Sequence, residues 1–252
     1  MDRDLQIPAV TRAAIAAARG RGVQFAIATG RMYQSAAPFA SELGLENMPI
    51  VAYNGALLKE FPSGKTLFHE PMPVETGRKL AAFCEAHQYH LQAYVDDKLY
   101  VGSMDRRTEQ YQSIARVPAF PVGSIFLWLQ EPSTKMLVVD DPERIPRILR
   151  EIRSLLGDEA QVVSSYPTFV EVTSSRVTKA TGLEKVAALL GVERSEVMAI
   201  GDAMNDIPML SWAGVSFAIG TAVDPVKRAA RYVTEKGPGE GVAEALQRMG
   251  LA

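Results

Sequence analysis

Residues 198–210 read Met198-Ala-Ile-Gly-Asp-Ala-Met-Asn-Asp-Ile-Pro-Met-Leu210, and this stretch decides the fold. A short apolar segment ends in Gly201, Asp202 follows at once, and Asn205 and Asp206 come three and four residues later. In a helix that begins here, this spacing places both carboxylates on one face of the first turn, with the Asn205 amide beside them. Carboxylates at the end of a buried strand suit Mg²⁺, which takes oxygen ligands. The alternative is that Asp202 only caps the helix and Asp206 is solvated.

The composition is that of an ordinary globular protein. Of the 252 residues, 47% are hydrophobic and 22% are charged, and the net charge is −2. This balance gives no electrostatic attraction to nucleic acid or to an anionic membrane. No apolar run approaches the ~20 residues that span a bilayer, and the N-terminus has no signal-peptide pattern. The single cysteine, Cys84, lies in an apolar stretch, so we expect a core residue and a cytoplasmic protein.

Strand and helix patterns alternate at both ends of the chain, which is typical of a parallel α/β sheet. The N-terminal patterns predict a helix, a strand, a helix and a strand over 8–19, 23–28, 33–43 and 49–53. From Lys179 onward, helices are predicted over 180–190, 206–213, 224–230 and 240–249, with strands over 197–201 and 215–219 and a short one near Tyr232.

The middle of the chain has a different pattern. After a helix over 74–88, strands over 89–95 and 99–101 are joined by a short turn. A strand over 134–140, a helix over 142–156 and two strands over 161–165 and 168–173 follow. Adjacent strands with short turns indicate an antiparallel sheet covered by helices. We therefore predict a discontinuous core domain, 1–71 and 174–252, interrupted by an inserted α+β domain, 72–173.

Polar residues stand where the predicted core strands end. Thr29 follows the apolar strand, Asn54-Gly55 closes the next one, and Lys179 stands just before a helix. Each has an ordinary alternative: a helix cap for Thr29, a turn dipeptide for Asn54-Gly55 and a solvated side chain for Lys179. In open parallel sheets, however, ligands bind beyond the carboxyl ends of the strands. Threonine, asparagine, lysine and paired carboxylates there predict a pocket for phosphate and magnesium.

In this order, Ala28-Thr-Gly-Arg31, Asn54-Gly-Ala56, Lys179 and Gly201-Asp-x-x-Asn-Asp206 resemble the motifs of the Cof-type haloacid dehalogenase-like phosphatases. Ala218-Ile-Gly-Thr-Ala222 and Gly241-Val242 extend the resemblance along the whole chain. The resemblance implies an α/β fold, with a Rossmann-like parallel-sheet core and an inserted α+β cap. It also implies Mg²⁺-dependent hydrolysis of a small phosphorylated metabolite, with no nucleic-acid or membrane partner.

The resemblance also implies a role for each motif residue. Thr29 would bind the phosphoryl group and Lys179 would neutralise its charge. Asp202 would hold Mg²⁺, with Asn205 and Asp206 completing the metal site or, for Asn205, contacting substrate. Further substrate contacts would come from Gly30, Arg31, Asn54 and Gly55. No motif identifies the cap residues that select the substrate. The candidates are Tyr94, Arg106, Arg107, Tyr111 and Trp128.

One family motif has no counterpart in the printed sequence. The family's nucleophile, which becomes an aspartyl-phosphate, and its general acid and base belong to an Asp-x-Asp-Gly-Thr motif at the end of the first central strand. Asp2 and Asp4 have the right mutual spacing, but no apolar strand precedes them and no Gly-Thr follows. We expect a start at an internal methionine, with roughly 10–20 residues absent by comparison with the family. The central strand of the sheet would then be missing, which leaves the edges of its two neighbours unpaired. Catalysis would be impaired, because the nucleophile belongs to that segment.

Two other functions stay open at this point. Without its nucleophile, the same scaffold would serve as a non-catalytic phosphate-ligand binding protein. With it, the chemistry would also suit phosphoryl transfer between sugar positions, as in phosphomutases. Hydrolysis is the interpretation that we favour, and the sequence does not identify the substrate or the oligomeric state.

Overall fold

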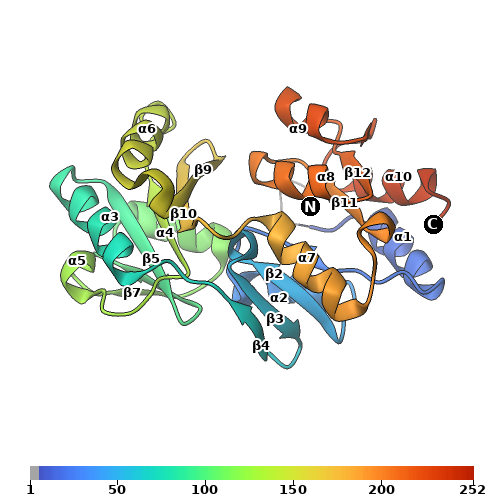
Figure 1. The fold of residues 1–252 in the computed structure, drawn as a ribbon, viewed down its shortest axis with the longest axis horizontal. Helices are drawn as coiled ribbons and strands as arrows, with labels where there is room; N and C mark the ends of the chain where they lie inside the picture. The colour runs from blue at the N-terminus through green and yellow to red at the C-terminus, as the bar shows by residue number, and fades with distance from the viewer. Residues whose placement is uncertain (1–5) are drawn as a thin grey trace.

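The computed structural model describes residues 6–252 of the chain. Asp2 and Asp4 lie outside the described residues. The elements from α3 to β10, in chain order, form what we call the insert unit, and the other described elements form the core unit (Figure 1). Within residues 6–252, every helix is too short or too polar to cross a bilayer.

The first core sheet begins with two parallel strands, β1 (Ile27–Ala28) and β2 (Met48–Ala52). An antiparallel hairpin, β3 (Leu57–Phe61) and β4 (Thr66–His69), extends this sheet beyond β2. Helices α1 (Ala9–Gly20) and α2 (Tyr33–Glu42) match the predicted ones closely. The hairpin was not predicted, and β1 is much shorter than the predicted strand because ladder bonds to β2 form only at its end.

The second core sheet is wholly parallel and follows the predicted alternation. Its strands are β11 (Met198–Gly201), β12 (Val215–Ala218) and β13 (Tyr232–Val233), in that order. Its helices are α7 (Lys179–Leu190), α8 (Ile207–Trp212), α9 (Asp224–Ala229) and α10 (Glu240–Arg248).

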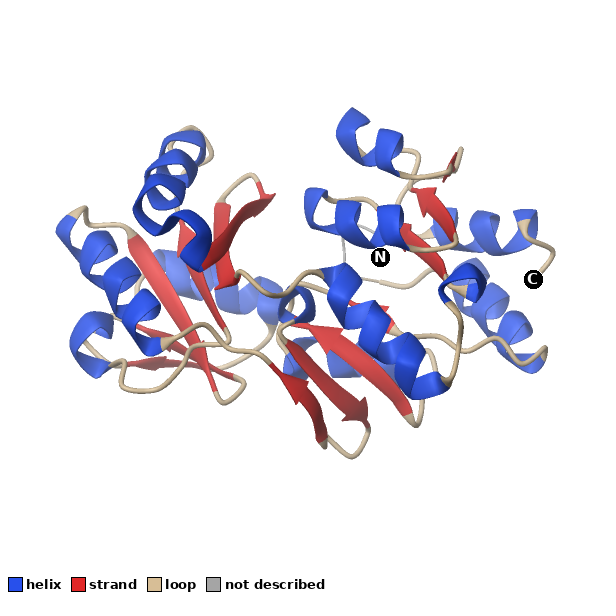
Figure 2. Ribbon diagram, viewed as in Figure 1, coloured by secondary structure: helices blue, strands red, loops and turns tan. Residues whose placement is uncertain are grey.

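The two core sheets remain separate. Among residues 6–252, β1 pairs only with β2 and β11 pairs only with β12 (Figure 2). Side chains nevertheless cross the separation, since Ala28 of β1 packs on the cluster that contains Ala199 of β11. The core unit is therefore joined by side chains and loops where a continuous sheet would use backbone hydrogen bonds.

The insert unit carries one six-stranded sheet, in the order β7-β6-β5-β8-β10-β9. The strands, in chain order, are β5 (His90–Val95), β6 (Lys98–Val101), β7 (Ala119–Pro121), β8 (Lys135–Val139), β9 (Ala160–Tyr166) and β10 (Phe169–Ser174). The helices are α3 (Val74–Ala86), α4 (Arg106–Ala115), α5 (Ile125–Trp128) and α6 (Ile145–Leu156). All pairs are antiparallel except β6 with β7.

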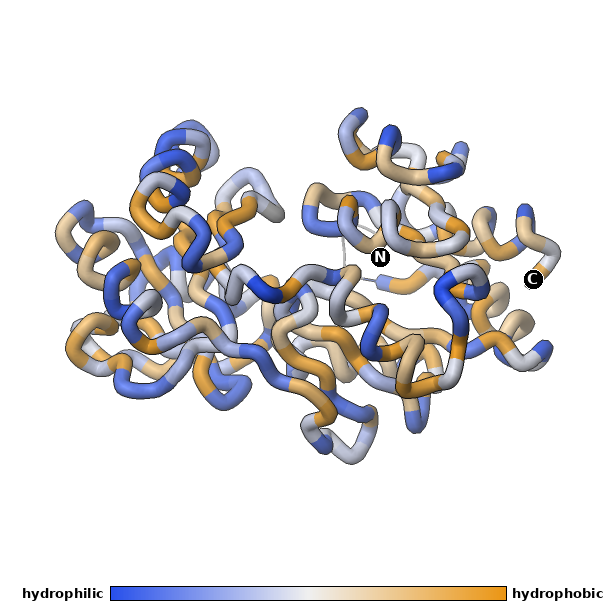
Figure 3. The backbone as a smooth tube through the Cα atoms, in the orientation of Figure 1, coloured by the Kyte–Doolittle hydropathy of each residue, from blue (hydrophilic) through white to orange (hydrophobic). Residues whose placement is uncertain are grey.

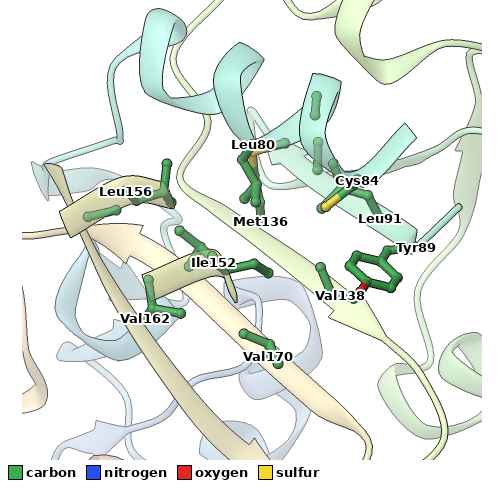
Figure 4. Packing of buried hydrophobic residues seen from close by; sticks show 14 of the residues in the cluster. Leu80, Cys84, Tyr89, Leu91, Met136, Val138, Ile152, Leu156, Val162 and Val170 are labelled. Atoms are coloured by element: carbon green, nitrogen blue, oxygen red, sulfur yellow. The ribbon is translucent and has the colours of Figure 1, made fainter. Parts of the chain in front are cut away.

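Two hydrophobic clusters hold the insert unit. One face of its sheet packs against α3 and α6, which bury Leu80, Cys84 and Ile152 completely (Figure 4). Hydrophobic and hydrophilic residues are interspersed along helix α6 (Figure 3), because each turn contributes to one buried stripe. The opposite face contributes Tyr94 to a cluster that also contains Tyr53 of the core unit. That shared cluster holds the two units against each other.

Candidate active site

The site forms where β1, β2 and β11 end. The Asn54 backbone N–H donates to the Thr29 carbonyl oxygen at 2.9 Å, so the loops after β1 and β2 are in contact. The Asn54 side chain accepts a hydrogen bond from the Asn205 amide at 2.8 Å, which joins them to the loop after β11. Next to Asn205, Asp206 accepts a hydrogen bond from Lys179. The predicted residues therefore belong to one connected site.

The loop after β1 is an open turn. The Thr29 hydroxyl accepts a hydrogen bond from the Arg31 backbone N–H at 3.1 Å, and the cap of α2 is Met32, so Thr29 does not cap that helix. A Cβ on Gly30 would lie 2.9 Å from Oδ1 of Asn54, so glycine lets the Asn54 side chain lie against the turn. The backbone of this turn at Gly30 therefore lies close to the Asn54 side chain.

Arg31 extends from this turn toward the insert unit. Its guanidinium donates to the hydroxyl of Ser35 at 3.3 Å and to the backbone carbonyl of Ile114, in α4, at 3.2 Å. Burial, followed by the neighbouring Arg116, lowers the pKa of Arg31, and the nearby Tyr111 and Tyr166 oppose this shift. Arg31 thus lies at the edge of the site and bridges the two units.

The Asn54-Gly55 pair brings the start of α7 to the site. Gly55 has a φ of +104°, and a Cβ there would lie 2.1 Å from the Thr178 carbonyl oxygen. Thr178 caps α7, because its hydroxyl accepts from the Thr181 backbone N–H. Glycine at position 55 therefore permits the close approach that places Lys179, the first residue of α7, beside the strand ends.

Lys179 and Asp206 form a buried ion pair. Nζ of Lys179 lies 2.5 Å from Oδ1 of Asp206, and the two residues are only 6% and 3% exposed. The other carboxylate oxygen of Asp206 accepts the backbone N–H groups of Asp202 and Ala203, both at 2.9 Å. The expected stacking of two carboxylates on one helical face does not occur, because a 3₁₀ turn, Met204–Asp206, precedes α8 and Asp206 folds back over the loop.

Asp202 and Asn205 present the oxygens that remain at the site. Asp202 stays exposed and makes no helix-capping hydrogen bond. Desolvation within the site, and then the Asp206 carboxylate, raise the pKa of Asp202, while Lys179 opposes this shift. Oδ1 of Asn205 is buried and accepts no hydrogen bond from any of residues 6–252.

These oxygens fit a magnesium site. A buried acceptor without a donor is costly unless a ligand satisfies it, and it lies in the same short loop as an exposed carboxylate. Mg²⁺ is commonly held by one or two carboxylates, with water and phosphate oxygens completing its shell. Among residues 6–252, no group of three or more His, Cys, Asp or Glu side chains gathers to hold a metal. Asp202 and Asn205 thus suit a cation shared with a phosphate.

Two residues of the insert unit reach the site, and sequence reasoning missed both. Nζ of Lys135, in β8, donates to the Gly30 carbonyl oxygen at 2.8 Å. Oε2 of Glu171, in β10, accepts from Nδ2 of Asn54 at 2.8 Å. The available signal was a single charged residue in each of these buried strands, since lysine and glutamate are rarely buried unless they are paired.

Comparisons with known proteins agree with this geometry. The family model of haloacid dehalogenase-like hydrolases matches residues 1–246. The chain is 28% identical over 247 residues to the putative phosphatase YxeH of Bacillus subtilis, covering 96% of this chain and 91% of YxeH. It is 31% identical over 230 residues to the 5-amino-6-(5-phospho-D-ribitylamino)uracil phosphatase YitU of the same species, covering 88% of this chain and 83% of YitU.

A solved structure shows the same fold along the whole chain. The crystal structure of a haloacid dehalogenase-like hydrolase from Bacteroides thetaiotaomicron superimposes with a TM-score of 0.87 at 26% identity, covering 99% of this chain and 95% of that one. The expected Rossmann-like core with an inserted α+β unit is confirmed. The chain belongs to the haloacid dehalogenase-like hydrolases, as a Cof-type phosphatase whose printed sequence contains no Asp-x-Asp-Gly-Thr motif.

Proposed function

We propose that this fold hydrolyses phosphate monoesters of small metabolites with Mg²⁺ as its cofactor. One observation carries the proposal: an exposed carboxylate, Asp202, shares a loop with the unpaired Asn205 oxygen and lies next to the buried Lys179–Asp206 pair. These groups stand at the carboxyl ends of parallel strands, where open α/β sheets bind their ligands. The names of the relatives, YitU among them, are those of phosphatases.

Each side chain has a separate task in this proposal. The Thr29 hydroxyl and the Gly30 backbone N–H bind the oxygens of the phosphoryl group, because the Thr29 N–H already donates to Val51 and the Arg31 N–H to the Thr29 hydroxyl. Lys179 keeps a fixed position because Asp206 holds it. Its two other N–H bonds have no acceptor among the described residues and are free to bind the phosphate. Asp202 and Asn205 hold Mg²⁺, which offsets the charge of the transferring group when bound.

The insert unit acts as a cap in this proposal. Its helix α4 touches Arg31, and Lys135 and Glu171 touch the loops of the core. A cap in this position excludes bulk water and contributes side chains that select the substrate. The substrate itself is a small soluble phosphate ester, as the name of YitU illustrates for that enzyme.

The attacking group is the part that residues 6–252 do not supply. A nucleophile must stand in line with the phosphorus, within about 3–3.5 Å. Both oxygens of Asp206 are hydrogen-bonded, and Asp202 is assigned to the cation. In the family the reaction passes through an aspartyl-phosphate, so we expect the printed chain to bind phosphate esters and to hydrolyse them slowly.

Hydrolysis of p-nitrophenyl phosphate tests this proposal. We compare the printed chain with a version extended at its N-terminus by a strand that carries Asp-x-Asp-Gly-Thr. The extended protein should show Mg²⁺-dependent turnover at least about 100-fold above the printed chain, as expected when a missing nucleophile is restored. Asp202→Ala should abolish this turnover, while Asp158→Ala, at an exposed position of the insert unit, should leave it unchanged. The absence of Mg²⁺-dependent turnover in the extended protein would contradict the assignment.

The engagement of Asp206 favours one second function, the non-catalytic binding of a phosphate ligand. In that case phosphate should raise the melting temperature of the printed chain, because a ligand that binds only the folded state stabilises it. The extended protein would then show the same thermal shift without turnover. Turnover by the extended protein would exclude this second function.

A further inference from the structure

A continuous row of buried polar contacts runs from the insert unit into the metal-binding loop. Lys135 is 2% exposed and Glu171 is 5% exposed, and Nζ of Lys135 lies 3.6 Å from Oε2 of Glu171. The same ammonium lies 4.8 Å from the centre of the Tyr94 ring. Two opposite charges are therefore held inside the contact between the units, where burial makes their geometry well defined.

Glu171 continues this row across the domain contact. Its Oε2 accepts from Nδ2 of Asn54 at 2.8 Å, and Oδ1 of Asn54 accepts from Nδ2 of Asn205 at 2.8 Å. Asn54 is 2% exposed and has left-handed backbone angles, with φ at +58°, so its side chain is tightly confined. The row ends at Oδ1 of Asn205, which is buried and has no hydrogen-bond donor in the described part of the chain.

The Glu171 carboxylate fixes the donor and acceptor ends of the amide groups that follow it in this row. A carboxylate accepts hydrogen bonds and has no proton to donate, so Asn54 must present its NH₂ group to Glu171. The Asn54 carbonyl oxygen then faces Asn205, which must in turn present its own NH₂ group. The only orientation left for the Asn205 amide directs its oxygen away from Asn54, as an acceptor for a ligand.

We propose that Glu171 is a positioning residue, which orients Asn205 through Asn54 so that Oδ1 of Asn205 is offered to Mg²⁺. The inference rests on the proposed function, because it assigns the regulation of the same metal site. Glu171 belongs to the insert unit and Asn205 to the core unit, so the row exists only while the two units are in contact. Closure of the cap and binding of Mg²⁺ are therefore coupled, and each favours the other.

A double-mutant cycle measures this coupling without substrate. Mg²⁺ affinity is determined by titration calorimetry for the native chain, Glu171→Ala, Asn205→Asp and the double variant. Glu171→Ala should weaken Mg²⁺ binding about tenfold, the range found when outer-shell partners of a metal ligand are removed. In the Asn205→Asp background the same change should have less than about a twofold effect, because a carboxylate presents an oxygen in either orientation.

A paired replacement of Lys135 and Glu171 distinguishes loss of the relay from a general loss of structure. Glu171→Ala leaves the Lys135 ammonium buried without its partner, so the cycle is repeated with the paired replacement Lys135→Met and Glu171→Leu. This pair removes both charges and keeps apolar volume at the contact, so it should reproduce the same dependence on Asn205.

Each remaining outcome is decisive. An equal loss of Mg²⁺ affinity in both backgrounds would mean that Glu171 acts only through overall stability, and it would overturn the relay. Unchanged Mg²⁺ affinity in Glu171→Ala would also overturn the relay while leaving the proposed function intact. A native chain that binds no Mg²⁺ would instead overturn the proposed function, and this inference with it.

Discussion

The insert unit and the core unit differ in how their strands are joined. The insert unit joins six strands in one ladder and covers one face with α3 and α6. The core unit divides its strands between a sheet of four and a sheet of three, and loops and side chains connect them. The candidate site lies where the ladder is interrupted, at the ends of β1 and β11. The residues of the candidate site therefore also connect the two sheets of the core unit.

The largest effect is expected from breaking the buried ion pair of the core unit. Lys179→Met leaves the Asp206 carboxylate buried without its cation, which should lower the free energy of unfolding by about 3–5 kcal/mol. The two tryptophans lie one in each unit, Trp128 in α5 and Trp212 in α8. Urea unfolding followed by Trp212 fluorescence in a Trp128→Phe background reports the core unit.

A matched surface variant controls that measurement. Lys236 is 61% exposed in its side chain, which forms an ion pair with Glu240 one turn away. Lys236→Met should change the free energy of unfolding by less than about 0.5 kcal/mol. Equal effects of the two substitutions would contradict the structural role of the Lys179–Asp206 pair.

In the insert unit, the corresponding weak point is packing. Ile152 is fully buried between α6 and the sheet, so Ile152→Ala removes apolar contacts and leaves a cavity. We expect a loss of about 3 kcal/mol, within the range of such substitutions, followed by Trp128 fluorescence in a Trp212→Phe background. Met104→Ala, at a position of the insert unit that is 47% exposed, serves as the control and should be nearly neutral.

Hydrogen exchange sharpens the contrast between the two kinds of sheet. Strand β8 has a partner on each side, whereas β1 and β11 each have one among the described residues. Backbone amides of β8 should exchange only by global unfolding, while those of β1 and β11 that face the separation should exchange much faster. The N-terminally extended protein should slow exchange in β1 and β11 alone. Similar protection of all three strands in the printed chain would contradict the description of the core as two separate sheets.

The smallest effect concerns Asp202 without metal. Its pKa is raised in the folded state, so its contribution to stability is present at low pH and is lost as the pH rises through that pKa. Asp202→Asn should therefore make the metal-free chain slightly more stable than the native chain near pH 7. Urea midpoints should converge as the pH approaches the ordinary carboxyl range. A variant that is less stable near pH 7 would show that Asp202 has a structural role.

Sequence reasoning located most of the fold because periodic patterns are local. The apolar period of α6 and the alternation of Tyr89, Leu91, Ala93 and Val95 identify buried faces, and all four of those alternating residues pack in the insert core. Cys84 is buried as expected, and burial raises the pKa of its thiol. The β3–β4 hairpin was not predicted, because it is buried by pairing with β2 and local periodicity does not reveal such pairing.

The structure brings together the residues that the sequence singled out, but their individual contacts were not predicted. Thr29, Lys179 and Asp202 were expected to lie close together, because parallel strands present their carboxyl ends at the same edge of a sheet. The positions of Lys135 and Glu171 depend on contact between two units far apart in sequence, and no spacing encodes it. The pairing of Asp206 with Lys179 likewise depends on a 3₁₀ turn that replaces the expected first turn of α8.

A crystal structure of the chain grown with Mg²⁺ and inorganic phosphate tests most directly whether the strand ends form one anion and metal site. We expect phosphate between the Thr29 turn and Nζ of Lys179, and Mg²⁺ on the Asp202 carboxylate and Oδ1 of Asn205. Phosphate and Mg²⁺ bound at other surfaces, with these side chains left as they are, would contradict the proposed site.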